Sequence, residues 1–81
     1  MSNTYEQNVK IVANRIQNQS INKILLADYD EPKWKIIVEI QNYLNEDKCS
    51  QFMSRLSTII HNGSHTEATI ENRIQALAEI L

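Results

Sequence analysis

The sequence predicts an all-α protein, an antiparallel up-down bundle of four helices. Apolar side chains recur at i, i+3, i+4 and i+7 along most of the chain, which is the spacing of one face of a helix. A single glycine and a single proline leave too few turn residues for β-hairpins. Short polar connections separate the apolar stripes and favour antiparallel neighbours. We expect residues 1–81 to form one domain.

The first helix is expected over residues 4–19. Thr4 and Gln7 have the spacing of a capping box, in which each side chain bonds a backbone N–H near the helix start. Ser20 interrupts the pattern, and an extra helical turn is expected near residues 20–26. The sequence leaves open whether residues 4–26 form one bent helix or two.

The next helix begins near Pro32, because proline is tolerated in a first turn whose N–H groups lack intrahelical partners. Asp30 is the expected N-cap, and Tyr29 and Trp34 have the spacing of a hydrophobic staple. The apolar face is wide, so we expect this helix to be the most buried. Its two ridges are Trp34, Ile37, Gln41 and Leu44, and Ile36, Ile40 and Tyr43.

Two amphipathic helices joined at residues 61–64 are expected in the second half. The first follows a bend at residues 45–48 and begins near Cys49, a small core thiol. Gly63 suits the C′ position of that helix, and Ser64 and Glu67 form a capping box for the last one. The two stripes are Cys49, Phe52, Met53, Leu56, Ile59 and Ile60, and Ile70, Ile74, Leu77 and Leu81.

Composition argues against several classes of protein. The net charge is −2 and the basic residues are scattered, whereas a nucleic-acid-binding protein carries a clustered basic face. One cysteine cannot form an internal disulfide, which fits a reducing compartment. Residues 1–10 lack the apolar segment of a signal peptide, and no apolar run approaches the roughly 20 residues that span a bilayer. We expect a cytoplasmic protein.

No pattern of catalysis or cofactor binding occurs. His61 and His65 are four residues apart, but a glycine and a serine between them break the helix that would align them on a metal. The acidic residues at 28–31 lack the spacing of a calcium loop. Cys49 has no base that the sequence assigns to it. We therefore expect no enzymatic activity, no cofactor and no metal.

Several short motifs occur in a fixed order over residues 8–80. They are Val9-Lys10-Ile11-Val12, Pro32-Lys33-Trp34, Tyr43-Leu44 before a polar bend, Ser54-Arg55-Leu56, and Ile74 and Leu77 followed by Ile80. This layout resembles the immunity proteins that protect lactic acid bacteria and streptococci from their own pediocin-like (class IIa) bacteriocins, of the enterocin A type. Two features depart from that family: the sequence ends at Leu81 without the usual C-terminal tail, and it is acidic where several relatives are basic. They leave the cognate bacteriocin open.

The resemblance implies a cytosolic four-helix bundle that acts by association. In that family, the immunity protein binds the complex of bacteriocin and mannose permease from the cytoplasmic side, so peripheral membrane association is expected. Specificity in the family maps to the C-terminal half. We therefore expect partner recognition at exposed residues of the hinge and last helix: His61, Asn62, His65, Thr66, Glu71, Arg73 and Gln75.

Two alternatives remain open at this point. The chain would also suit a small cytosolic regulator, adaptor or phage-type inhibitor that binds a soluble protein. Ile11, Ile80 and one residue of the Ile36 and Ile40 ridge are expected to be exposed off the main stripes, so the sequence leaves open a monomer or a weak homodimer.

Overall fold

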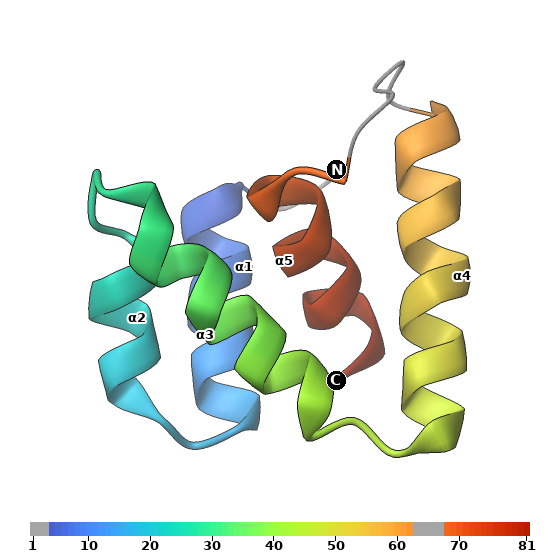
Figure 1. Ribbon diagram of the computed structural model, residues 1–81, viewed down its shortest axis with the longest axis horizontal. Helices are drawn as coiled ribbons and strands as arrows, with labels where there is room; N and C mark the ends of the chain where they lie inside the picture. The colour runs from blue at the N-terminus through green and yellow to red at the C-terminus, as the bar shows by residue number, and fades with distance from the viewer. Residues whose placement is uncertain (1–3, 63–67) are drawn as a thin grey trace.

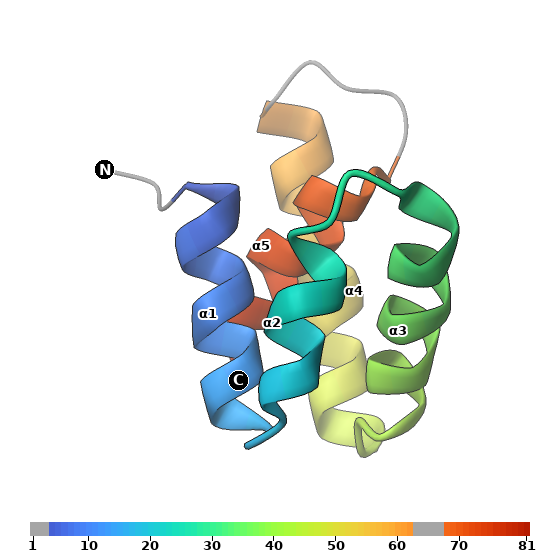
Figure 2. The ribbon, with the colours of Figure 1, turned by 90° about the vertical axis from the view of Figure 1, so that its left-hand side faces the viewer.

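The computed structural model describes residues 4–62 and 68–81, which contain five helices and no strand. The all-α prediction is confirmed, with five helices in place of the expected four. The chain reverses direction from each helix to the next (Figures 1 and 2). The helices are α1 (Tyr5–Arg15), α2 (Gln19–Leu25), α3 (Asp30–Asn42), α4 (Glu46–Asn62) and α5 (Ile70–Ile80).

The predicted capping box starts α1. The Thr4 hydroxyl accepts a hydrogen bond from the Gln7 amide at 3.2 Å, and the Gln7 side-chain oxygen accepts one from the Thr4 amide at 3.0 Å. Two backbone N–H groups at the helix start thereby gain partners.

Residues 4–26 form two helices, and the break lies at residues 16–18. Gln17 adopts φ 54°, a left-handed conformation that costs a non-glycine residue about 1 kcal/mol and ends α1. Asn18 then caps α2, because its side-chain oxygen accepts from the Ser20 amide at 3.2 Å. Ser20 lies inside α2, so the expectation that it interrupts the helix is wrong.

Two helix starts in the middle of the chain differ from the prediction. Tyr29 is the N-cap of α3 and Asp30 lies in its first turn, where the helix dipole still favours a carboxylate. Helix α4 begins at Glu46 in place of Cys49, because the Asn45 side-chain oxygen accepts from the Lys48 amide at 2.8 Å. Residues 46–48 of the expected bend therefore lie in the first turn of α4.

The last helix begins at Ile70. Thr69 is its N-cap, with the hydroxyl oxygen accepting from the Asn72 amide at 3.2 Å. The capping box predicted at Ser64 and Glu67 lies outside the described residues, and so does Gly63.

Helix α5 is the centre of the fold. Helices α1, α3 and α4 pack against it, and α2 packs against α1 and α3 (Figure 1). Its buried residues are Ile70, Asn72, Ile74, Ala76, Leu77 and Ile80. Helix α3 buries only Ile37 and Ile40, so the prediction that it is the most buried helix is wrong. Each of the two predicted ridges contributes one buried residue, Ile37 from one and Ile40 from the other, and the remaining residues of both ridges are half-buried or exposed.

Several further apolar residues lie elsewhere than expected. Cys49 is exposed and is not a core thiol. Ile80 and Ile40 are buried and Ile11 and Ile36 are half-buried, so none of them forms the exposed apolar surface on which the homodimer alternative depends. The core combines α1, α2 and α5 with single faces of α3 and α4: Val9, Val12, Ala13, Ile21, Leu25, Ile37, Ile40, Phe52, Leu56, Ile70, Ile74, Ala76, Leu77 and Ile80.

Two cations bind the carboxyl end of α5. Lys48 Nζ donates to the Ile80 carbonyl oxygen at 2.6 Å, and Arg15 Nη1 donates to the Leu81 carbonyl oxygen at 3.2 Å. Carbonyl groups at a helix end lack intrahelical partners, and a positive charge there is favourable. These bonds fix α1 and α4 to the same end of α5.

Tyr5 links the first three helices. Its hydroxyl donates to the Leu25 carbonyl oxygen at 2.7 Å, and Lys33 Nζ lies 5.9 Å from the centre of its ring. Burial, with the nearby Glu71 and Asp30 carboxylates, raises the pKa of Tyr5 to about 12.

We predict that Tyr5 makes stability fall at high pH. Unfolded Tyr5 ionises near pH 10 whereas the folded protein retains the proton, so the free energy of unfolding holds its full value below pH 10 and decreases between pH 10 and 12. After allowance for solvent screening, the loss is about 1–2 kcal/mol. Tyr5→Phe should remove this part of the decrease in urea unfolding. It should also cost about 1 kcal/mol at pH 7 through the lost hydrogen bond.

Tyr29→Phe is the matched control, because Tyr29 is exposed and its hydroxyl donates to Glu31 at 2.9 Å. This variant should keep the decrease in stability above pH 10. An unchanged pH profile in Tyr5→Phe would show that Tyr5 ionises alike in the folded and unfolded chains.

Candidate functional site

The recognition residues expected from the sequence lie on more than one face of the molecule. Asn62 and Gln75 come together along α4 and α5, and His61 is exposed in the last turn of α4. Glu71 is exposed in the first turn of α5, whereas Arg73 faces α3. His65 and Thr66 lie outside the described residues.

Asn62 and Gln75 line a polar cleft between α4 and α5. One hollow of about 350 Å³ is lined by Arg55, Thr58, Ile59, Asn62, Asn72, Gln75 and Glu79. A second hollow of about 550 Å³ shares Arg55, Thr58 and Glu79 with it and continues toward the start of α4, past Ser50, Gln51, Ser54 and Ile80. We call the two together the α4–α5 cleft. Hydroxyl and amide groups dominate its lining, so it is suited to hydrogen bonding.

An ion pair joins the two helices in the middle of the cleft. Arg55 Nε lies 3.2 Å from Glu79 Oε2, and both side chains are partly open to solvent. Such a pair stabilises a protein by about 0–1 kcal/mol, so its main effect is to hold both side chains in place. The partner of Arg55 lies on α5, far from it along the chain, so spacing in the sequence cannot reveal the pair.

Arg73 connects α5 to α3. Its Nη1 donates to the Gln41 side-chain oxygen at 3.2 Å, and its Nε donates to the Ala68 carbonyl oxygen at 3.4 Å. The guanidinium carbon lies 5.4 Å from the centre of the Trp34 ring, within the range of a cation–π contact. These contacts hold the Arg73 guanidinium against α3 of the same molecule, so it does not point outward toward a partner.

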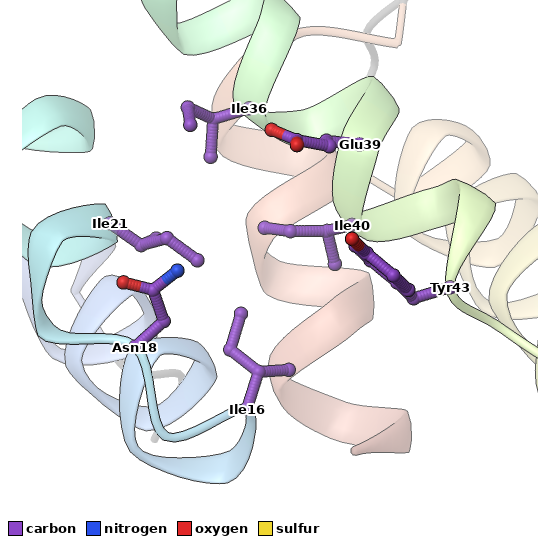
Figure 3. A pocket seen from close by; sticks show the side chains of 7 residues that line it. All are labelled: Ile16, Asn18, Ile21, Ile36, Glu39, Ile40 and Tyr43. Carbon is purple, nitrogen blue, oxygen red and sulfur yellow. The ribbon is translucent and has the colours of Figure 1, made fainter.

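A second concave site lies between α2 and α3 and was not found from the sequence. Its volume is about 470 Å³, and we call it the α2–α3 groove. Isoleucine side chains from both sides point toward one another across it (Figure 3). The signal for it is the double apolar ridge of α3: one residue of the Ile36 and Ile40 ridge is expected to be exposed, but the sequence does not reveal a concave site beside it. The lining residues are Ile16, Asn18, Ile21, Ile36, Glu39, Ile40 and Tyr43.

Within residues 4–62 and 68–81, no three His, Cys, Asp or Glu side chains gather in a group that could hold a metal ion. No helix in these ranges has the length and apolar character needed to cross a membrane.

Comparison with known proteins gives no match: no family model, no curated protein and no solved structure matches this chain.

We predict that Arg73 contributes more to stability than Arg55. Arg73→Ala removes two hydrogen bonds and a cation–π contact from a partly buried site, and should lower the free energy of unfolding by about 1–2 kcal/mol. Arg55→Ala removes an exposed pair and should cost less than about 1 kcal/mol. Urea unfolding measures both changes.

Trp34 fluorescence gives an independent measurement, because Trp34 is the only tryptophan. Arg73→Ala should shift its emission to longer wavelength by exposing the ring to water, and Arg55→Ala should leave the emission unchanged. Equal costs and equal spectra for the two variants would contradict the role assigned to Arg73.

Proposed function

We propose that this chain is a bacteriocin immunity protein that protects a producer cell from a pediocin-like bacteriocin. It acts without catalysis and without a cofactor, by binding the complex of bacteriocin and mannose permease from the cytoplasmic side of the membrane. The motif order over residues 8–80 supports this proposal. In this proposal α1, α3, α4 and α5 correspond to the four helices of the antiparallel bundle in that family, and α2 is the extra helical turn.

The α4–α5 cleft is the observation on which the proposal rests. It lies in the C-terminal half, where the resemblance places specificity, and it is lined mainly by hydroxyl and amide groups. A partner must match each donor and acceptor, because an unmatched polar group loses its bonds to water on burial. A cleft of this kind therefore discriminates between closely related partners. Asn62 and Gln75 are its expected recognition residues, and His61, Glu71 and the linker residues His65 and Thr66 belong to the same half of the chain.

A small helical regulator or inhibitor of a soluble protein is the second candidate. The exposed apolar side chains of α3 favour it, since Trp34 and Val38 are 41% and 52% exposed in a small protein that has few apolar groups to spare. Such a protein would bind its target without any membrane component.

We predict that expression of the chain in a sensitive strain raises tolerance to at least one pediocin-like bacteriocin. Thr58→Arg should abolish the protection, because it places a long charged side chain in the cleft. Ser57→Arg is the matched control on the same helix: Ser57 is exposed and does not line the cleft, so this variant should protect like the parent. The minimal inhibitory concentration across a panel of bacteriocins is the measurement.

Unchanged killing across the panel, with the protein present and folded in the cells, would contradict the immunity function. The regulator of a soluble protein would then be the remaining candidate function. Protection that Thr58→Arg and Ser57→Arg abolish equally would contradict the role of the cleft.

A further inference from the structure

Helix α3 carries most of the exposed apolar surface among the described residues. Tyr29, Trp34, Val38 and Tyr43 lie on it or at its ends, and all four are exposed. A helix with a wide apolar face normally buries that face. In α3 a large part is left open; of its apolar residues that line the α2–α3 groove, Tyr43 is exposed, Ile36 is half-buried and Ile40 is buried.

The shape of the groove matches an apolar helix face. Ile36, Ile40 and Tyr43 follow one another at i, i+4 and i+7 along α3, a length of about 10 Å or two helical turns. Ile16 and Ile21 form the facing wall, and the side chains of both walls point into the space between them (Figure 3). Grooves with such anchor spacing bind amphipathic helices through apolar residues of matching period.

The charge on the α3 side of the groove is negative. Glu39 is its only charged lining residue and forms no ion pair with any described residue. Residues 28–47, which contain α3 and its flanking turns, carry six carboxylates and two lysines, whereas the rest of the chain carries four carboxylates and six basic residues. One of the two lysines, Lys33, is only 12% exposed and pairs with Asp30 at 3.7 Å. The field at α3 therefore favours a positive partner.

We propose that the α2–α3 groove is the docking site for a cationic amphipathic helix of a partner protein. The partner's apolar side chains enter between Ile21 and Ile36, and a lysine or arginine of the partner pairs with Glu39. A second copy of this chain is disfavoured as occupant, because a two-fold contact through the groove brings the two Glu39 carboxylates together. This inference does not rest on the immunity function, since it assigns a partner class to a different surface.

The test is binding of a designed peptide to the full chain. The probe is a fluorescein-labelled 14-residue peptide of leucine and lysine, with leucine at i, i+3, i+4 and i+7. Two comparison peptides have the same composition with leucine scattered, or glutamate in place of lysine. Fluorescence anisotropy should give at least tenfold tighter binding for the first peptide than for either comparison peptide. Higher salt should weaken it, because exposed charges are screened.

Variants of the protein locate the site. Glu39→Lys should weaken peptide binding at least tenfold, and Tyr43→Ser should weaken it at least threefold. Tyr43 is 83% exposed, so its replacement does not disturb the core. Val38→Ser is the matched control, since Val38 is exposed on α3 but does not line the groove, and it should change affinity less than twofold. If Glu39→Lys fails to fold, Glu39→Gln removes the charge with little change of shape and should weaken binding at least threefold. Amide shifts in NMR spectra should be confined to residues 16–21 and 36–43.

Three results would overturn the proposal. One is equal binding of the amphipathic and scattered peptides, which would reflect unspecific attraction to an acidic chain. Another is that Glu39→Lys and Val38→Ser weaken binding of the peptide equally. The last is sedimentation of the free protein as a dimer that Tyr43→Ser dissociates, which would make a second copy the occupant.

Discussion

Burial of the apolar stripe of α5 is the interaction on which the rest of the structure depends. Ile74 and Leu77 are fully buried at the place where α1, α3 and α4 meet α5. Each contributes roughly 1.5–3 kcal/mol relative to an exposed side chain, a large share of the stability of so small a domain. Within the described ranges, α5 is the one helix against which α4 packs broadly. The bonds from Lys48 and Arg15 then hold α4 and α1 to its carboxyl end.

The central position of α5 also determines where binding surfaces can form. A helix surrounded by three others has little free surface: among the described recognition residues on it, Glu71 is exposed, and Arg73 and Gln75 are half-buried. The concave sites lie instead where α5 meets α4, in the α4–α5 cleft, and between its neighbours α2 and α3, in the α2–α3 groove. One is lined mainly by hydrogen-bonding groups and the other by isoleucines, so the two sites suit partners of different chemistry.

Local features of the fold were predictable and features of the tertiary arrangement were not. The capping box of Thr4 and Gln7 involves atoms three residues apart, so neighbouring sequence determines it. Periodicity likewise predicted helical stretches across the chain. It could not tell that each ridge of α3 buries a single residue, because that depends on how α5 and α2 pack against α3. For the same reason, the partner of Arg55 on α5 and the exposure of Cys49 had no signal in the sequence. The α2–α3 groove could not be predicted, because its facing wall comes from Ile16 and Ile21, which are distant from α3 along the chain.

Native-state amide hydrogen exchange tests the central role of α5 most directly. Amides that open only when the whole protein unfolds exchange slowest, whereas peripheral helices open at lower free energy. If α5 is central, the slowest exchange in the chain falls at residues 74–77 of α5, and the amides of α3 and α4 exchange faster. Slowest exchange in α3 or α4, with α5 opening before them, would contradict it.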